Sequence, residues 1–441
     1  MQFLSGSLRA AQIGFQRKKG KFRNCCDLFL LTCCWVSVIP LFYYGFMFSM
    51  FLMKLFFWAL IGILFYTYLG YGVIVWMLVK LGRRKRSVIH REEERELLTV
   101  AHVIAAYNEE DVIAGKIENS LAIDYPRHLQ RIIIVADGSS DKTTEIIRRY
   151  PQVELFFEPE RKGKVAALNR VVSRVSESDI VVFSDANSLL NPVAFSLIMR
   201  HYTDPHIGGV SGEKRVITSG KLLGQGEGLY WRYESALKKL DSDFHSVVGA
   251  AGELFSIRRE LFMKMPEDLI LDDFYMSLNV CRMGWIVQYE PRAIAMESPS
   301  FSPADEMRRK IRISAGVFQS MVLMKDLLNI SRYGKLAFQY VSRRVLRSAI
   351  CPFVIPVILF LNIAIIVRSG EYYAIFFGQI FFYLLAFIGW LFSSSSRIVP
   401  MIFYAPYYFV FMNLSAWMGL HRYLNGTQSA IWEKAKRERL P

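Results

Sequence analysis

The sequence predicts an α/β fold, in which a doubly wound parallel sheet lies between two membrane-spanning regions. Apolar residues concentrate in residues 28–81 and again in residues 345–421, whereas the stretch between them has the composition of a soluble domain. Within that middle stretch, short apolar runs alternate with helical patterns, which is typical of parallel strands joined by crossover helices. We therefore expect a membrane protein with one large water-facing domain.

The N-terminal region, residues 1–82, is expected to hold one or two transmembrane helices. The segment Phe56–Val79 is uncharged and longer than the roughly 20 residues that cross a bilayer. Leu28–Phe51 is a second candidate, and the residues alone leave open whether positions 1–49 belong to the chain. The basic cluster Arg83–Arg86 follows directly, which predicts by the positive-inside rule that the middle domain is cytosolic.

The domain expected over residues 83–329 begins with four strands separated by helices. The apolar runs that predict these strands are Thr99–Ala106, the run from Ile132, Val153–Glu158 and Asp179–Asp185. We expect Asn108 to cap the first helix and Asp141 the second, because short polar side chains are favoured at helix N-termini.

Polar residues follow these strands where they end. Asp137 stands after the second strand, and Asp185 and Asn187 stand after the fourth. Open α/β sheets bind ligands at the carboxyl ends of their strands, and two oxygen ligands on one edge can hold Mg²⁺ against a diphosphate. The glycine-rich fingerprints of dinucleotide oxidoreductases and P-loop ATPases are not found after these strands, which argues against both classes.

Beyond the domain we expect an interfacial amphipathic helix at residues 330–348, transmembrane helices within residues 349–420 and a basic tail at 421–441. The apolar candidates are Ala349–Val367, Tyr372–Phe392 and Val399–Leu420. Three spans would place the basic tail outside the cell, against the charge rule, so the number of spans stays open.

The charge balance indicates a membrane surface as the partner. Lys and Arg outnumber Asp and Glu by 54 to 39, which gives a net charge of +15, and the basic clusters flank apolar segments. That arrangement fits anionic lipid headgroups, and we expect no nucleic-acid partner. The six cysteines show neither a disulfide framework nor zinc-ligand spacing, so reduced thiols are expected.

Five motifs occur in an order that resembles family 2 glycosyltransferases: "VIAAYNEE", "VADGSSD", "KGKVAALN", "SDAN" and "LDDF". The chain resembles the membrane-embedded, processive branch that includes cellulose, chitin, hyaluronan and poly-N-acetylglucosamine synthases. The resemblance covers residues 99–319 and the flanking spans. It implies a GT-A-like domain that binds a nucleotide sugar, with Mg²⁺ or Mn²⁺ as the cofactor.

The resemblance also implies a role for each site residue. Asp273 would be the catalytic base with Asp272 supporting it, and Asp185 and Asn187 would hold the metal beside the donor. The other donor-binding residues would be Asp137 at the base, Lys164 at the diphosphate and Arg312. This chain departs from the family in having Asn187 where many relatives carry Asp, and in lacking the Gln and Trp that flank the Arg aligned with Arg312.

The residues themselves leave structural alternatives open. Asp137 fits a turn aspartate that bonds its own backbone, and Lys164 fits a solvated lysine. Asp272 and Asp273 also suit a helix start, where acids pair with the helix dipole, and Arg312 suits a basic helix that lies on headgroups.

The expected function is an inverting hexosyl- or N-acetylhexosaminyltransferase of a bacterial inner membrane, with an accessory export subunit as a further partner. The donor would be a UDP-sugar, by resemblance alone, and the acceptor a growing cell-surface polysaccharide. One alternative is transfer of a single sugar to a lipid carrier or glycolipid. Another, of a different class, is a polysaccharide transporter without catalysis, which the lack of charges within the apolar spans disfavours.

Overall fold

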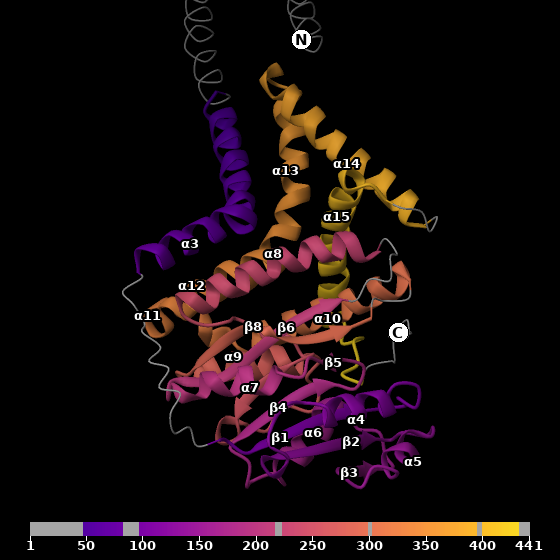
Figure 1. Ribbon diagram of the computed structural model, residues 1–441. Helices are drawn as coiled ribbons and strands as arrows, with labels where there is room; N and C mark the ends of the chain where they lie inside the picture. Colours follow the sequence, from indigo (N-terminus) through magenta and orange to yellow (C-terminus); the bar gives the residue numbers. More distant parts are fainter. Residues whose placement is uncertain (1–46, 83–96, 217–222, 299–301, 395–398, 432–441) are drawn as a thin grey trace, which may run out of the picture.

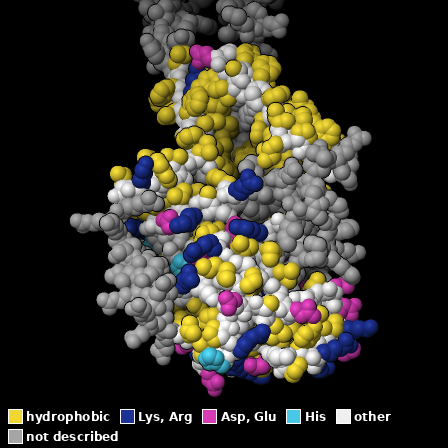
Figure 2. All heavy atoms as spheres, in the orientation of Figure 1, with side chains coloured by type: hydrophobic (Ala, Val, Ile, Leu, Met, Phe, Trp, Pro, Cys, Tyr) yellow, Lys and Arg dark blue, Asp and Glu magenta, His cyan; other side chains and the backbone are white. Residues whose placement is uncertain are grey.

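The computed structural model describes residues 47–82, 97–216, 223–298, 302–394 and 399–431. Figure 1 shows an α/β domain with a group of long helices on one side of it. Apolar side chains gather on these helices, while Lys, Arg, Asp and Glu side chains are scattered over the domain (Figure 2).

An eight-stranded sheet runs through the domain in the order β3-β2-β1-β4-β7-β6-β8-β5. Its strands are β1 (Val100–Ala106), β2 (Gln130–Asp137), β3 (Val153–Glu158), β4 (Ile180–Asp185), β5 (Leu189–Leu190), β6 (Ile207–Val216), β7 (Phe255–Arg258) and β8 (Ile286–Glu297). The first four strands are parallel, as expected, but β7 and β5 are antiparallel to their neighbours. The sheet is therefore mixed, and the expectation of a wholly parallel sheet is wrong for its second half.

Helices cover both faces of the sheet, because alternate residues of the buried strands point to opposite sides. On β1, Ile104 packs with α4 and α5, whereas Val103 packs with α6 and α9. The helices of the domain are α4 (Ile113–Leu121), α5 (Thr143–Ile147), α6 (Lys164–Val172), α7 (Ala194–Met199), α8 (Leu223–Phe244), α9 (Asp272–Arg282) and α10 (Pro303–Leu323). The doubly wound architecture is thus confirmed.

The first helix of the domain begins later than expected. Asn108 has a φ of 52°, in the left-handed region, and α4 starts only at Ile113. An N-cap residue has an extended backbone, so the prediction that Asn108 caps this helix is wrong. Its side chain instead accepts a hydrogen bond from the N–H of Ser140, which ties the loop after β1 to the loop after β2. Asp141 does act at its helix start, where it accepts from the N–H of Thr143.

Three helices in the described part of the chain are long and apolar enough to cross a membrane: Met47–Leu81, Lys335–Ile366 and Gly370–Ser393. The first contains the π-helical turn η1 (Tyr66–Gly70), after which α3 (Tyr71–Leu81) turns aside and packs on α8 (Figure 1). The second consists of α12 (Lys335–Tyr340), η6 (Val341–Ile350) and α13 (Cys351–Ile366), and the short helix α11 (Ile330–Tyr333) precedes it. The third is formed mainly by α14 (Tyr373–Ser394). The candidate span Leu28–Phe51 lies almost wholly outside the described residues.

The last helix, α15 (Met401–Leu424), packs along α10 of the domain. A Cβ added to Gly419 would lie 2.5 Å from Cβ of Ser314 and 2.8 Å from the backbone N of Ala315, so the two helices are in close contact. The chain then returns to the sheet, where Ile431 Cγ1 lies 3.6 Å from the position that a Cβ would take on Gly163. The described end of the chain therefore lies on the same side of the apolar helices as the domain.

Candidate active site

The site lies at the carboxyl edge of the sheet, where the strand order reverses between β1 and β4. Asp185 is the last residue of β4 and pairs with Ala105 near the end of β1. Asp137 is the last residue of the neighbouring strand β2. Connections leave this point in opposite directions, which opens the crevice in which doubly wound sheets bind ligands.

Asp137 supports the loop that precedes α6. Its carboxylate is buried, and Oδ2 accepts hydrogen bonds from the N–H groups of Gly163 (2.6 Å) and Lys162 (3.1 Å). Arg170 Nη2 donates to Oδ1 at 2.8 Å. Gly163 has a φ of 95°, which a residue with a side chain rarely adopts. The loop therefore depends on Asp137 for its shape, and a contact of this carboxylate with a nucleotide base stays a prediction.

The planar side chains of Tyr107 and Arg161 stack on each other beside this loop. The guanidinium carbon of Arg161 lies 3.6 Å from the centre of the Tyr107 ring. Gly138 has a φ of 69°, and a Cβ at this position would lie within 3 Å of the Arg161 backbone. The absence of a side chain at Gly138 therefore allows the two loops to come this close. Sequence reasoning missed this pair, although "AAYNEE" and "PERKGK" place an aromatic and a cation beside two of the motifs. Both groups offer a planar face on which a base can stack.

Lys164, the first residue of α6, connects three elements of the site. Its Nζ lies 2.9 Å from Asp185 Oδ1 and 3.1 Å from Asp272 Oδ2. Burial lowers the pKa of this lysine, but the charges of Asp185, Asp272 and Asp273 outweigh burial and raise the pKa above its usual value. Lys164 is therefore a fixed positive charge and not a solvated lysine.

Asp272 and Asp273 begin α9, as the sequence suggests, but they differ in their surroundings. Burial is the main cause that raises the pKa of Asp273 to about 7, and the negative charges of Asp272 and Glu253 raise it further, while Lys164 lowers it. A carboxylate with a pKa near neutral is suited to general base catalysis.

Arg312, on α10, interacts electrostatically with the same acids. Burial lowers the pKa of its guanidinium, while the charges of Asp272, Asp273 and Asp185 oppose that effect. The structure thus brings together Lys164, Asp185, Asp272 and Asp273, with Arg312 in their electrostatic environment.

Oxygen ligands for a divalent cation are present at this edge. Carboxylate oxygens of Asp185, Glu253 and Glu297 lie within 4.8 Å of one another, and hard cations prefer such donors. Lys214 forms ion pairs with Glu253 and Glu297 and so neutralises part of their charge. Asn187 stands two residues after Asp185 in the turn that follows β4, half-buried. The residues present therefore fit a divalent metal.

Glu253 and Glu297 escaped sequence reasoning because they come from elements far apart in the chain. Glu253 lies in the loop before β7, and Glu297 ends β8.

The turn after β4, which carries Asp185, is held in place by Lys116 and Ser188. Lys116 Nζ donates to the carbonyl of Ser188 at 2.6 Å, and Ser188 Oγ donates to the carbonyl of Asp185 at 2.9 Å.

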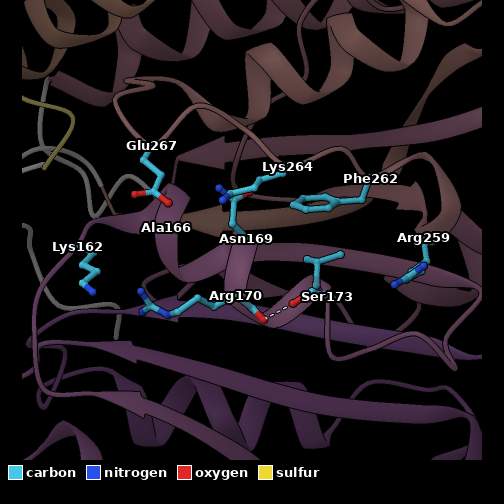
Figure 3. A pocket seen from close by; sticks show the side chains of 10 residues that line it. Lys162, Ala166, Asn169, Arg170, Ser173, Arg259, Phe262, Lys264 and Glu267 are labelled. Carbon is cyan, nitrogen blue, oxygen red and sulfur yellow. Dashed lines mark hydrogen bonds between the residues drawn. The ribbon is translucent and has the colours of Figure 1, made fainter.

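A cavity of about 560 Å³ lies against α6, and Lys164, Asp185, Asp272 and Asp273 are not among the residues that line it (Figure 3). It follows the outer face of α6 next to the segment before α9. The residues labelled around it are Lys162, Ala166, Asn169, Arg170, Ser173, Arg259, Phe262, Lys264 and Glu267. Asn169 closes one side, since its side chain exchanges two hydrogen bonds with the backbone of Met265.

A family model described as glycosyl transferase family 2 matches residues 102–265, which include β1, β2, β4 and the loop before α6. Residues 102–265 are thus similar to the family 2 glycosyltransferases. The resemblance expected from the five motifs is thereby confirmed.

Two curated relatives belong to the polysaccharide synthase branch. The chain is 24% identical over 274 residues to a poly-beta-1,6-N-acetyl-D-glucosamine synthase of Staphylococcus epidermidis, which covers 60% of this chain and 65% of the relative. It is 26% identical over 242 residues to the synthase of the same name from Staphylococcus aureus, covering 53% and 58%. The matched stretch thus spans less than two thirds of these relatives.

A solved mannosyltransferase from Pyrobaculum calidifontis, in complex with GDP-Man and Mn²⁺, shares the fold. It superimposes with a TM-score of 0.63 at 20% identity, covering 84% of this chain and 99% of that one. The GT-A-like fold expected from the sequence is confirmed. The roles of the individual site residues stay predictions.

Proposed function

We propose that the chain is an inverting glycosyltransferase that moves an N-acetylhexosaminyl residue from a UDP-sugar to a growing cell-surface polysaccharide. The observation that carries this proposal is the half-buried Asp273, with a pKa of about 7, beside the Lys164–Asp185–Asp272 ion cluster at the reversal of the sheet. The names of the curated relatives support the sugar and the acceptor.

The donor's diphosphate would lie against Lys164 and Arg312, whose charges interact with Asp185, Asp272 and Asp273. A divalent cation, Mg²⁺ or Mn²⁺, held by Asp185 with Asn187 and Glu253, would neutralise further phosphate charge. The base would stack on the outer face of the Tyr107–Arg161 pair, with Asp137 holding the loop before α6 in place.

Transfer would be a single displacement at the anomeric carbon. The acceptor oxygen bonds to this carbon while the bond between the carbon and the phosphate oxygen breaks, and the nucleoside diphosphate leaves with the electron pair. Asp273 takes the proton of the acceptor hydroxyl. Attack opposite to the leaving group inverts the anomeric configuration, and Lys164 stabilises the charge that develops on the diphosphate.

The membrane arrangement supports delivery of the product into or across a bilayer. We infer that the chain is a multi-pass protein of a bacterial inner membrane with a cytosolic domain, in which α13 leads away from the domain and α14 returns to it. The described end of the chain then lies on the cytosolic side, which agrees with the charge rule for its basic tail. An accessory export subunit stays a prediction.

A second candidate is transfer of one sugar to a lipid carrier. The apolar helices beside the domain favour it, because a lipid-linked acceptor would lie among them. A transporter without catalysis has less support, since it would not need an acid with a raised pKa, Asp273, beside the positive charge of Lys164.

The test is turnover by membranes that contain the protein, with a panel of labelled nucleotide sugars, in Mg²⁺, in Mn²⁺ or with a chelator. We expect release of UDP from UDP-N-acetylhexosamine only with metal, together with a long water-soluble product. A short product that partitions into organic solvent would favour the lipid acceptor. No release from any donor by folded protein would contradict the proposal.

A further inference from the structure

A π-helical stretch interrupts the helix that leads from the domain into the apolar segment. It is η6, and its ten residues carry Arg343, Arg344 and Arg347. π-Helical turns are rare and occur mostly at functional sites. Each of the three arginines has partners in another element of the domain.

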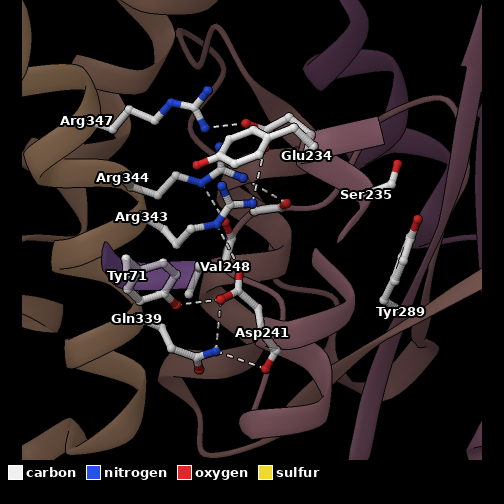
Figure 4. Close-up of polar contacts among 12 residues, drawn as sticks. Tyr71, Glu234, Ser235, Asp241, Val248, Tyr289, Gln339, Arg343, Arg344 and Arg347 are labelled. Atoms are coloured by element: carbon white, nitrogen blue, oxygen red, sulfur yellow. Dashed lines mark hydrogen bonds and ion pairs between the residues drawn. The ribbon is translucent and has the colours of Figure 1, made fainter. Parts of the chain in front are cut away.

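Two of them anchor α8. Arg343 Nε lies 2.8 Å from Asp241 Oδ2 and its Nη2 lies 3.2 Å from Glu234 Oε2, while Arg347 also pairs with Glu234 (Figure 4). Glu234 and Asp241 stand two helical turns apart on one face of α8, so both pairs fix this helix to η6.

Arg344 has different partners. Its Nε donates to the carbonyl of Val248 at 2.6 Å, and its Nη2 donates to the carbonyl of Gly249 at 3.1 Å. Gly249 has a φ of 95°, and a Cβ there would lie 2.5 Å from Phe274 Cδ2 and 2.7 Å from Arg344 Nη2. The loop after α8 is therefore held tightly between Arg344 and α9.

The same loop contacts the start of α9 at two further points. The N–H of Ala250 donates to Ser277 Oγ at 2.9 Å. A Cβ on Gly252 would lie only 3.1 Å from Asp273 Oδ2, so the loop backbone lies directly against this carboxylate. Arg344 itself lies over Phe274, with 5.2 Å between the guanidinium carbon and the ring centre.

We propose that Arg344 is a positioning residue, which acts through the loop 248–252 to hold the Asp273 carboxylate in its reactive position. The inference rests on the proposed function, because it gives Asp273 the role of base. It also means that the geometry of the base depends on η6, which is continuous with the membrane-facing helix α13.

The test compares Arg344→Met and Arg344→Lys with Arg332→Met, which changes an exposed arginine on α11. Each protein is assayed for kcat, for donor KM and for hydrogen exchange in peptides that cover residues 248–255 and 272–280. We expect Arg344→Met to lower kcat about 100-fold, the effect of a small misplacement of a catalytic group, with donor KM within about twofold. Arg344→Lys should recover part of the loss, since lysine can bond one of the two carbonyls, and Arg332→Met should match the wild type.

Hydrogen exchange separates this inference from the proposed function, because it needs no sugar transfer. We expect faster exchange in both peptides of Arg344→Met. Unchanged exchange, or a kcat within about threefold of wild type, would overturn the positioning role. If exchange rises as expected but Asp273→Asn turns over donor like the wild type, then the proposed base is wrong and the coupling between η6 and α9 remains.

Discussion

At the start of α9, Asp273 is surrounded by groups that act on its proton in opposite directions. Burial, Asp272 and Glu253 favour the protonated acid, and Lys164 favours the carboxylate. Asp272 next to it bonds Lys164 directly and so has a partner for its charge. Two adjacent acids in the first turn of one helix therefore have different surroundings, which the sequence does not reveal.

The pKa of Asp273 predicts the pH dependence of transfer. A base acts only when deprotonated, and the pKa is raised from 3.8 to about 7. We expect kcat/KM to rise about tenfold per pH unit below neutrality and to level off above it. The check is UDP release measured between about pH 5 and pH 9, and a profile that is already flat at about pH 5 would contradict this account.

The close contact between Gly252 and Asp273 predicts that a side chain at position 252 impairs the base. A Cβ at this position would lie 3.1 Å from Oδ2 and 3.3 Å from Cγ of Asp273, so Gly252→Ala must displace the carboxylate slightly. We expect kcat to fall by about tenfold with donor KM unchanged. Gly115→Ala on α4 is the matched control, since a Cβ there meets no atom within 4 Å. Equal rates for the two variants would show that the loop does not press on Asp273.

At the scale of elements, α8 is joined to η6 by buried charges. Glu234 pairs with Arg343 and Arg347, and burial, which raises its pKa, is outweighed by the charges of Arg347 and Arg343, so that the pKa is lowered. Removing one partner of a buried ion pair leaves the other charge uncompensated.

We therefore expect Glu234→Gln to reduce the free energy of unfolding by about 3 kcal/mol, within the range for breaking a buried pair. Denaturant unfolding of the detergent-solubilised protein measures it. Glu145→Gln breaks the exposed pair with Arg149 on α5 and should leave stability nearly unchanged. A similar small effect for both substitutions would mean that the buried pairs do not fix α8.

The sequence predicted the elements that depend on local pattern better than those that depend on distant partners. β3 has the expected bounds, Val153–Glu158, and β4 begins one residue after its expected start. The antiparallel strand β7 pairs with β4 across about 75 residues, and no local pattern encodes such pairing. The prediction for Asn108 is wrong because asparagine is favoured both in left-handed turns and at helix N-caps.

The residues of the candidate site likewise divide into those that a local sequence pattern predicts and those that depend on distant partners. Lys164, Asp185, Asp272 and Asp273 were predicted from motifs at strand ends and helix starts, and the structure brings them together. Glu253, Glu297 and Arg344 were missed, because their places are set by a loop, a strand end and a π-helix that meet only in the folded chain.

At the scale of the whole molecule, two helices that are long and apolar enough to cross a membrane follow the domain in the described part of the chain, and α15 packs on α10. This arrangement accounts for the conflict between three candidate spans and the basic tail. α15 has apolar and aromatic residues, as a span has, but it buries Tyr404, Tyr408 and Phe411 in a cluster with Met307 of α10.

The arrangement predicts that the C-terminal end and the domain lie on one side of the membrane. A protease-cleavable tag after Pro441 should be protected in intact spheroplasts and cut in inside-out vesicles. A tag inserted at Ser369, between α13 and α14, should behave in the opposite way. Cleavage of the C-terminal tag in spheroplasts would show that α15 crosses the membrane.

The central claim is that Asp273 accepts the proton of the acceptor hydroxyl, and one substitution tests it most directly. UDP release at saturating donor should be compared for the wild type, Asp273→Asn and Asp268→Asn, the last an exposed aspartate in the loop before α9. We predict that Asp273→Asn lowers kcat by about 10²- to 10⁴-fold, the contribution of a general base, while it still binds donor and metal and Asp268→Asn keeps full rate. An Asp273→Asn protein that releases UDP at the wild-type rate would contradict the account.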